Sequence, residues 1–332
     1  MSQRGPHWDS PILQSVMPVI ESSRFVTTHA DAVERVADWL AYEEFPAPTG
    51  AMLFDIGDDP DRIMDHTMMI NIINFAFTDF TTGVKFQTEY QGRVWTDSEA
   101  MVACVHRALM AGTPMLSGAY LAAVDEAELG RVFAGNIEMP MASERAAAMR
   151  SVGDVLVSRY DGAFHNFIRS CEPRLFASGE GILERLVREF PRFNDVSDYH
   201  GQPVQIQKLA QLALWSLHLT LAPRGKWALA DVGMFTAFAD YIVPVALRVM
   251  GVLSYDAGLE SRIAGGVAIP RDSDEEIELR AHSVYATALL TDAVNARRPG
   301  MTPVVVPQID YKLWSRYHVT HWPHHLTITT MY

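Results

Sequence analysis

Cysteine is scarce in this chain of 332 residues, which contains only Cys104 and Cys171. Both lie inside apolar or helical patterns, and their separation matches no zinc-binding spacing. A disulfide framework or a cysteine-based zinc site is therefore not expected. Two buried thiols suit a reducing compartment, which predicts a cytoplasmic protein.

Basic residues are also few, because 27 Lys and Arg stand against 40 Asp and Glu, for a net charge of −13. A protein that binds duplex nucleic acid or tRNA usually needs a basic face that displaces counterions. The charge argues against a nucleic acid polymer as the partner. A small molecule is the expected ligand.

No apolar run is suited to crossing a membrane. The most apolar long run, residues 235–253, is interrupted by Asp240, Pro244 and Arg248, and the first eight residues lack the apolar core of a signal peptide. We therefore expect neither a membrane span nor export.

Internal repeats, low-complexity tracts, a glycine-rich phosphate loop and the Gly-x-Ser-x-Gly elbow of many hydrolases are absent from the sequence. No clear linker divides the chain, and 48% of its residues are hydrophobic, which is enough for a large core. We predict one compact domain over residues 1–332.

What the chain does contain is an apolar stretch, residues 204–250, that carries charges where a core is expected. A buried charge costs several kcal/mol unless it is paired or used, so Asp240 is the strongest candidate for chemistry. Pro244 cannot donate to the carbonyl of residue 240, and a helix must kink or restart there. Asp240 then either faces a ligand or caps the helix that begins near Pro244.

Lys208 and Asp231 are the other charged residues of interest in this stretch. A helix over residues 204–219 places Lys208 with Gln211 and Trp215 on one face. The lysine either reaches water along the tryptophan, which is the interpretation that the pattern favours, or binds a phosphate or carboxylate in a pocket. Asp231 either orients Lys208 or caps a helix, and we rank the cap higher.

Helical periodicity dominates the rest of the chain. Helices are predicted after Thr28, Thr96 and Ser273, and residues 119–190 are helical with three breaks, at 136–140, 161–162 and 179–181.

Three further segments are expected to be non-helical. Residues 84–95 alternate apolar and polar side chains around a Gln-Gly turn, which predicts a β-hairpin. Residues 190–201 are expected to form a polar loop and residues 326–332 a terminal strand. The predicted fold class is mainly α with a small β-hairpin element.

Two clusters invite a metal, and neither fits one well. Residues 55–61 are rich in aspartate, but positions 6 and 12 of a calcium loop fall on Pro60 and His66, so a helix start is favoured. The four histidines of residues 318–325 are interrupted by Trp322-Pro323, which disrupts the fixed geometry that zinc requires. We expect no metal and no cofactor.

Acid and aromatic side chains interleave again near the C-terminus, where Asp310 is followed by Tyr311 and Trp314. Flat aromatic faces beside a hydrogen-bond acceptor suit the stacking and edge recognition of a heterocycle.

Six runs of this chain resemble, in the same order, the queuosine salvage protein family, which contains queuosine 5′-phosphate N-glycosylases, hydrolases that release the base queuine. The runs are Asn74-Phe-Ala-Phe77, Tyr90-Gln-Gly-Arg93, His106-Arg-Ala-Leu-Met-Ala-Gly-Thr-Pro114, Met234-Phe-Thr-Ala-Phe-Ala-Asp-Tyr-Ile-Val-Pro244, Glu276-Ile-Glu-Leu-Arg280 and Asp310-Tyr-Lys-Leu-Trp314. The resemblance implies a mainly helical single domain, similar in fold to the helix-hairpin-helix DNA glycosylases but acting on a free nucleotide.

The resemblance also implies a set of site residues. The family's Phe-Ala-Asp run falls on Phe238 and Asp240, and its C-terminal Asp-Tyr falls on Asp310 and Tyr311. The adjoining Tyr241, Trp314 and Ser315 complete the expected substrate-binding set.

Some positions depart from the family pattern. Ser315 stands where some relatives have an acid, so a polar contact to the ligand is lost or replaced. The family's lysine resembles Lys208, although Gln207 replaces an aromatic residue before it. A histidine of the relatives has no clear match near Phe54 and Asp55.

Hydrolysis of an N-glycoside passes through an oxocarbenium-like sugar, which Asp240 is expected to stabilise or to attack. Lys208 either neutralises the 5′-phosphate or keeps Asp240 ionised. The 7-deazaguanine base presents two adjacent donors, which we assign to Asp310, with Phe238 and Tyr311 as stacking faces.

The expected partners are queuosine 5′-monophosphate as substrate and queuine as product, for salvage into tRNA modification. We expect a cytoplasmic monomer that binds no nucleic acid polymer and no membrane. Two alternatives stay open. One is a non-catalytic protein that binds a modified nucleobase or nucleotide, and the other is a nucleic-acid glycosylase acting on a flipped base, which the net charge disfavours.

Overall fold

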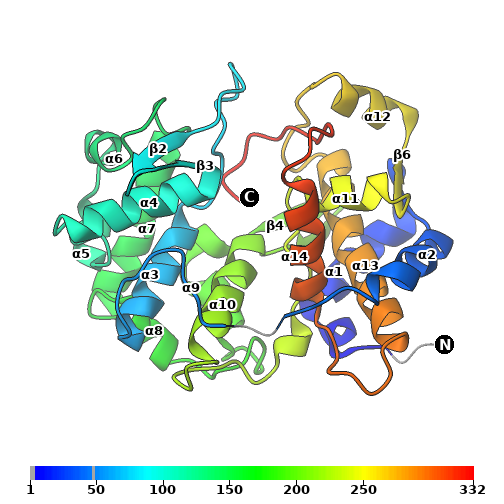
Figure 1. The fold of residues 1–332 in the computed structure, drawn as a ribbon, viewed down its shortest axis with the longest axis horizontal. Coiled ribbons are helices and arrows are strands. Elements are labelled where there is room, and N and C mark those ends of the chain that lie inside the picture. The colour runs from blue at the N-terminus through cyan, green and yellow to red at the C-terminus, as the bar shows by residue number, and fades with distance from the viewer. Residues whose placement is uncertain (1–3, 47–48) are drawn as a thin grey trace. The chain divides into compact units, whose positions relative to one another are not determined.

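A computed structural model describes residues 4–46 and 49–332. In these ranges the chain forms fourteen α-helices and three two-stranded antiparallel sheets (Figure 1). The mainly α prediction is confirmed, while the likeness to helix-hairpin-helix DNA glycosylases stays a prediction. Internal contacts group the chain into two compact units, each described by itself below. The prediction of a single domain over residues 1–332 also stays a prediction.

The first unit comprises Met1–Ala47, Asp195–Gln211 and Asp231–Ile328. Its elements are the 3-10 helices η1 (Pro6–Asp9) and η3 (Val232–Met234), the helices α1 (Pro11–Ser22), α2 (Ala30–Leu40), α11 (Val243–Val249), α12 (Ala257–Ala264), α13 (Asp274–Ala296) and α14 (Val306–Tyr317), the start of α10 (Lys208–Leu221), and the strands β1 (Val26–Thr28), β4 (Val196–Tyr199), β5 (Gln202–Gln205) and β6 (Leu253–Tyr255).

Helix α13 is the central element of this unit. It begins where the sequence predicts, because the Ser273 hydroxyl accepts a 3.3 Å hydrogen bond from the Glu276 N–H. Helices α1, α2, α11 and α14 pack around it, and Figure 1 shows α13 in orange among them. Its apolar residues, such as Leu279 and Val284, belong to the two hydrophobic clusters of the unit. Burial on several faces explains why charged residues of α13 are also withdrawn from water.

Two buried acids of α13 hold the N-terminal segment. Glu278 accepts hydrogen bonds from the backbone N–H groups of residues 24–26 and from the Tyr199 hydroxyl, at 2.7–3.0 Å for the closest contact of each. Asp292 accepts a 2.6 Å hydrogen bond from the Trp8 indole N–H. Since a buried carboxylate is tolerated only when it is hydrogen-bonded, these contacts hold Trp8 and residues 24–26 against α13.

The β4–β5 hairpin corrects the sequence prediction, which assigned residues 190–201 to a polar loop. Val196 pairs with Gln205, and the turn at His200 and Gly201 has φ values of +54° and +84°. Strand β4 is only four residues long and half polar, so its alternation of apolar and polar side chains is too weak to be recognised as a strand. The predicted terminal strand over residues 326–332 is also wrong, since it is reduced to one bridge between Leu326 and Ala268.

The second unit comprises Pro48–Asn194, Leu212–Ala230 and Thr329–Tyr332. Its elements are α3 (Pro60–Ile72), β2 (Gln87–Tyr90), β3 (Arg93–Thr96), α4 (Asp97–Met110), α5 (Gly118–Ala123), α6 (Glu126–Val132), α7 (Ala142–Arg159), α8 (Phe164–Arg169), α9 (Ile182–Glu189), η2 (Pro191–Phe193) and the rest of α10.

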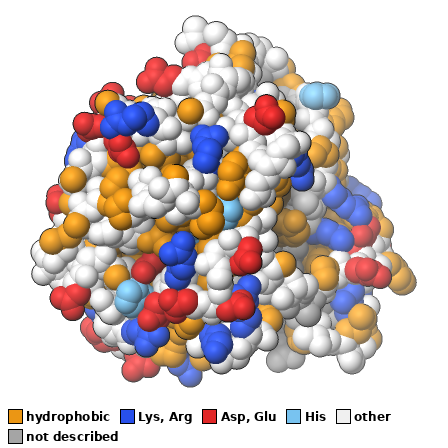
Figure 2. Space-filling view, turned by 60° about the vertical axis from the view of Figure 1, so that its left-hand side comes forward, with side chains coloured by type: hydrophobic (Ala, Val, Ile, Leu, Met, Phe, Trp, Pro, Cys, Tyr) orange, Lys and Arg blue, Asp and Glu red, His pale blue; other side chains and the backbone are white. Residues whose placement is uncertain are grey.

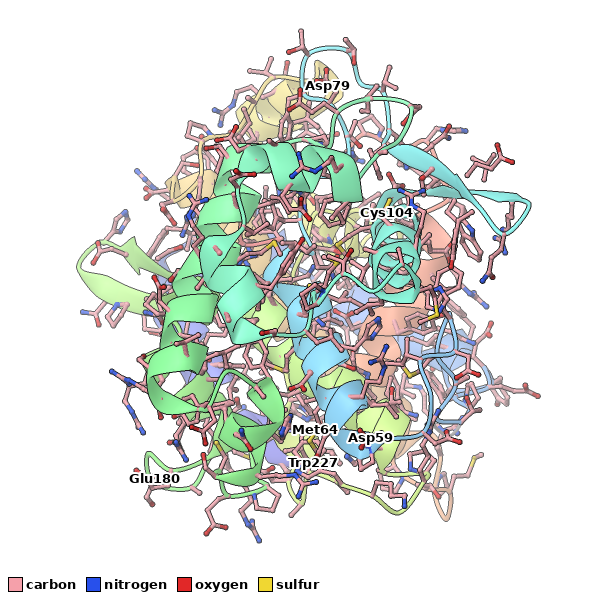
Figure 3. The ribbon with its side chains drawn as sticks, turned by 90° about the vertical axis from the view of Figure 1, so that its left-hand side faces the viewer. Asp59, Met64, Asp79, Cys104, Glu180 and Trp227 are labelled. Atoms are coloured by element: carbon pink, nitrogen blue, oxygen red, sulfur yellow. The ribbon has the colours of Figure 1, made fainter. Side chains whose placement is uncertain are left out.

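Several predictions for this unit are confirmed. Strands β2 and β3 form the expected hairpin, with Gln91 and Gly92 in the left-handed conformation that its tight turn requires. All three predicted breaks between residues 119 and 190 separate helices. Asp59, labelled in Figure 3, caps the start of α3 by accepting a hydrogen bond from the Asp61 N–H, as a helix start requires. Gly153 lets α7 approach α5, because a Cβ there would overlap the backbone of Ala122.

Cys104 is buried, as predicted, whereas Cys171 is only half-buried, and both are free thiols. Among the helices that the structure describes, none is both long and apolar enough to span a membrane.

Candidate active site

The site is built on residues 235–240 of the first unit, a buried segment that forms neither helix nor strand. Such a segment cannot satisfy its own backbone groups, so other parts of the chain must supply hydrogen-bond partners. The amide side chain of Gln211, from α10, provides the first of them. Its Oε1 accepts a 3.0 Å hydrogen bond from the Thr236 N–H.

The next two backbone groups are bound by charged side chains. Oδ2 of Asp310, from α14, accepts a 2.8 Å hydrogen bond from the Phe238 N–H. Nε of Arg280, from α13, donates a 3.1 Å hydrogen bond to the Ala239 carbonyl. Three helices therefore fix the segment immediately before Asp240.

Asp240 is buried, with 7% of its surface exposed, and its two oxygens differ. Oδ1 accepts hydrogen bonds from the N–H groups of Ile242 and Val243, at 2.7 and 3.1 Å, just where α11 begins. Oδ2 has no hydrogen bond within the described part of the chain. Helix α11 begins at Val243, so a helix starts beside Pro244 as predicted. Asp240 binds the first N–H groups of that helix with one oxygen, which leaves the other for a ligand.

Lys208 opens α10 and is 8% exposed, which corrects the interpretation that its side chain reaches water. Burial lowers the pKa of Lys208, and the neighbouring carboxyl groups of Asp240 and Asp310 oppose that shift. Its Nζ makes no hydrogen bond to the residues that the structure describes. The spacing of apolar residues along the helix could not reveal that the face with Lys208, Gln211 and Trp215 is buried too.

Asp310 has the most perturbed carboxyl group of this cluster. Burial, and then the negative charge of Asp240, raise the pKa of Asp310 to about 8, although the hydrogen bond from Phe238 and the charge of Lys208 oppose the shift. The protonated form of Asp310 is thus favoured far more than that of an exposed aspartate. A buried carboxyl group with a raised pKa, beside a second carboxyl group and a buried amine with a lowered pKa, is typical of functional sites.

The remaining predicted substrate-binding residues lie around this cluster. Phe238 is buried in the segment, and Tyr241 packs against His324 with ring centroids 4.6 Å apart. Tyr311 is 65% exposed on α14, one residue after Asp310.

The last two lie further along α14. Trp314 is partly buried and stacks on His318 at 4.4 Å, and the Ser315 hydroxyl bonds to the Lys312 carbonyl. The structure therefore brings Asp240, Lys208, Asp310 and Phe238 together and leaves Tyr311 facing outward.

Asp231 lies at the start of the 3-10 helix η3, in the first unit. It is partly buried and precedes η3, but its side chain makes no capping hydrogen bond, so the preferred cap interpretation is wrong. The other expected role of Asp231, in which it orients Lys208 and so takes part in catalysis, stays a prediction.

Sequence reasoning missed two residues of the cluster. Asp195 lies at the base of the β4–β5 hairpin and is 2% exposed, and Arg280 is 1% exposed. A charged residue at a core-facing position of a helix was a usable signal for Arg280. Nothing marked Asp195, because it belongs to a run of polar residues that reads as a surface loop.

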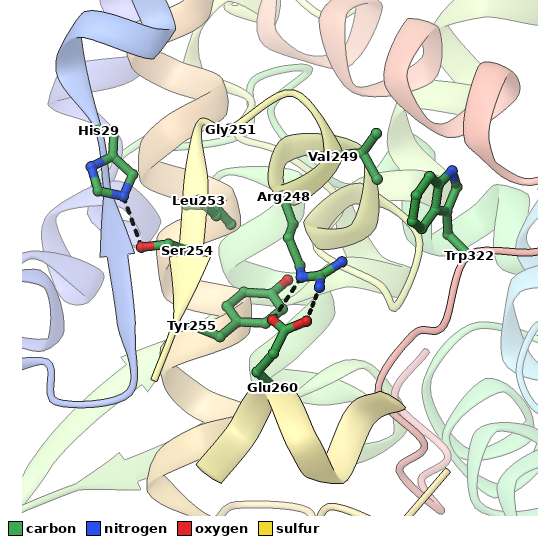
Figure 4. A pocket seen from close by; sticks show the side chains of 9 residues that line it. All are labelled: His29, Arg248, Val249, Gly251, Leu253, Ser254, Tyr255, Glu260 and Trp322. Atoms are coloured by element: carbon green, nitrogen blue, oxygen red, sulfur yellow. Dashed lines mark hydrogen bonds and ion pairs between the residues drawn. The ribbon is translucent and has the colours of Figure 1, made fainter. Parts of the chain in front are cut away.

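A separate cavity of about 440 Å³ opens beside β6 (Figure 4). Four of its polar side chains bind one another in pairs, since His29 bonds to Ser254 at 2.7 Å and Arg248 bonds to Glu260 at 2.8 Å. None of the predicted site residues lines this cavity. Over the described ranges, no group of three His, Cys, Asp or Glu side chains could hold a metal ion.

The profile of the queuosine salvage protein family matches residues 54–332. The chain belongs to this family. Among relatives of the family, the queuosine 5′-phosphate N-glycosylase/hydrolase of Sphaerobacter thermophilus is 30% identical over 97% of both chains. Proteins of the same name from Mus musculus and Schizosaccharomyces pombe are 26% and 28% identical, over 86% and 76% of this chain and 82% and 73% of their own lengths. The queuosine salvage resemblance seen in six sequence runs is thereby confirmed.

Proposed function

We propose that this chain is an N-glycoside hydrolase that releases queuine from queuosine 5′-monophosphate, for salvage into tRNA modification. The names of its relatives support this activity. One relative matches nearly the whole chain, which supports assigning the activity of that relative to this chain. The observation that carries the chemistry is the buried cluster of Asp240, Asp310 and Lys208 on a fixed segment.

Asp240 acts at the sugar. When the bond between C1′ and the base nitrogen breaks, the base keeps the electron pair and positive charge develops on the sugar. Oδ2 of Asp240 either stabilises this charge or bonds to C1′ before water displaces it. Water then adds to C1′ and loses a proton, while the base gains one. Because Oδ1 is held by two backbone N–H groups, the carboxylate is oriented before substrate arrives.

Asp310 acts at the base. Its Oδ2 already accepts the Phe238 N–H, which leaves Oδ1 and a second lone pair for the two adjacent donors of the 7-deazaguanine edge. That contact needs an ionised carboxylate, so binding of the base works against the raised pKa of Asp310. Phe238 supplies a stacking face beside it, and Tyr311 stacks only on a ligand that reaches the exposed side of α14.

Lys208 acts on the carboxyl groups of the site. Since its amine is buried near both carboxyl groups, holding Asp240 ionised suits its position better than neutralising a phosphate in water.

We further propose that residues 1–332 act as one hydrolase domain and as a monomer in the cytoplasm, without a nucleic acid polymer as partner. The two free thiols suit a reducing compartment. On the face drawn in Figure 2, basic and acidic side chains are interspersed, which is unlike the basic stripe of a polymer-binding surface.

The test is to incubate the purified chain with queuosine 5′-monophosphate and to detect free queuine by mass spectrometry. Catalytic release supports the proposal. Stoichiometric binding of the nucleotide without any release would instead identify a binding protein. Retention of the chain by tRNA in a salt-dependent manner would favour a polymer substrate.

A further inference from the structure

Arg280 and Asp195 form a buried, two-pronged ion pair in the first unit. Nη1 and Nη2 of Arg280 lie 3.1 and 2.6 Å from Oδ1 and Oδ2 of Asp195, and both side chains are at most 3% exposed. Glu276 lies 3.6 Å from Nη1, one turn earlier on α13. The guanidinium plane is thus fixed by its partners, as in other bidentate arginine–carboxylate pairs.

Asp195 also holds the start of α10. Its backbone carbonyl accepts hydrogen bonds from the N–H groups of Ile206 and Gln207, at 3.1 and 3.2 Å. Its Oδ2 lies 3.4 Å from the Lys208 N–H, a long hydrogen bond. The residue that binds Arg280 therefore also sets where Lys208 leaves the hairpin and enters the helix.

Arg280 holds the opposite side of the cluster. Its Nε donates to the Ala239 carbonyl, which belongs to the peptide bond that enters Asp240. Rotation of that peptide would turn the Asp240 carboxylate, and the contact with Arg280 opposes it. One connected path thus runs from the backbone of Lys208 through Asp195 and Arg280 to the backbone of Asp240.

We propose that Asp195 and Arg280 are positioning residues that set the geometry of Asp240 relative to Lys208. The inference rests on the proposed hydrolase function. A buried ion pair is weak evidence for stability, because the cost of removing two charges from water offsets much of their attraction. Its fork geometry and its position between two site residues instead suit the orientation of reacting groups, where a displacement of about 1 Å costs on the order of 100-fold in rate.

The experiment compares Arg280→Lys, Asp195→Asn and the double variant in steady-state release of queuine, with thermal unfolding of each. Lysine keeps the charge of Arg280 but loses the fork, and asparagine keeps the shape of Asp195. The matched control is Glu278→Gln, which alters an equally buried acid of α13 whose hydrogen bonds go to residues 24–26 and to Tyr199.

We expect each single variant to lower kcat about 10- to 100-fold while KM changes less than about threefold. The double variant is expected to be no slower than the worse single variant, since the pair acts as one unit. Glu278→Gln should lower the unfolding temperature and leave kcat unchanged. Where Arg280→Lys does not fold, Asp195→Asn carries the same test.

A folded Arg280→Lys or Asp195→Asn variant with at least half of the wild-type kcat overturns the inference, and so does an equal loss of kcat in Glu278→Gln. Either result leaves the hydrolase proposal standing, provided that the wild-type chain releases queuine. A wild-type chain that releases none contradicts the proposed function itself.

Discussion

Oδ2 of Asp310 accepts a 2.8 Å hydrogen bond from the backbone N–H of Phe238, two residues before Asp240. The same carboxyl group has a pKa raised to about 8, by burial and by the charge of Asp240. The hydrogen bond from Phe238 needs only an acceptor oxygen at position 310. The titration, by contrast, needs a carboxyl group. An asparagine at position 310 would keep the acceptor oxygen and remove the titration, so the two effects can be measured separately.

Asp240→Asn should abolish turnover while the fold persists. The amide oxygen can still accept from the Ile242 and Val243 N–H groups, so the start of α11 is retained. Loss of the negative charge beside the sugar is expected to lower kcat by on the order of 1,000-fold or more. The measurement is queuine release, together with the unfolding temperature.

The matched control for this variant is Asp256→Asn, because Asp256 caps α12 through the Gly258 and Leu259 N–H groups in a comparable way. It should leave turnover unchanged. Full activity in Asp240→Asn would remove Asp240 from the mechanism.

Lys208→Met should reduce turnover equally on queuosine and on its 5′-monophosphate. The charge of Lys208 lowers the pKa of Asp310, so its removal lets that carboxyl group gain a proton more readily, and the acid limb of the pH–rate profile is expected to move to higher pH. Substitution of the exposed Lys226 by Met is the control. A selective loss on the 5′-monophosphate, with no movement of the acid limb, would assign Lys208 to the phosphate.

Asp310→Asn should stabilise the fold in a pH-dependent manner. A carboxyl group whose folded-state pKa is raised from 3.8 to about 8 loses stability as the pH rises through that interval, because the unfolded chain releases the proton first. The variant removes this loss, so its advantage should be small near pH 4 and reach several kcal/mol near pH 8. Denaturant unfolding at the two pH values measures it. Parallel pH dependences of the two proteins would mean that Asp310 is already ionised in the fold.

His282 should make the first unit sensitive to acid. Its ring nitrogens bond to the hydroxyls of Ser23 and Thr28 at 2.6 and 2.7 Å, and burial lowers its pKa to about 4. Since the imidazole must stay neutral in the fold, its stabilising contribution is present above pH 6.5 and is lost as the pH falls toward 4. His282→Gln, which bears no titrating ring, should weaken the dependence of the unfolding temperature on pH in this window. An unchanged slope would place the acid sensitivity elsewhere.

How far the sequence predicts this molecule differs between its elements. Period and capping signals found α13 at Ser273, the β2–β3 hairpin and the restart of the helix at Pro244, because each depends on local chemistry. The burial of the Lys208 side chain was not predictable, since it depends on how distant segments pack over α10.

The candidate site shows the same division. Asp240 was found because a charge in an apolar run is conspicuous, and Asp310 because acid and aromatic residues interleave around it. Asp195 was missed, because its burial arises only when the hairpin folds against α13, 85 residues away in sequence from its partner Arg280. Whether the outward-facing Tyr311 contacts a ligand stays a prediction.

The contacts of Glu278 and Asp292 with residues 8 and 24–26 limit where a shortened fragment of this protein can begin. The family profile starts at residue 54, so a fragment cut at that boundary would contain every proposed catalytic side chain. It would also leave two acids inside α13 with their main hydrogen-bond donors deleted, and such orphaned acids disfavour folding. The part of the chain that the family profile matches is thus shorter than the part that has to be expressed.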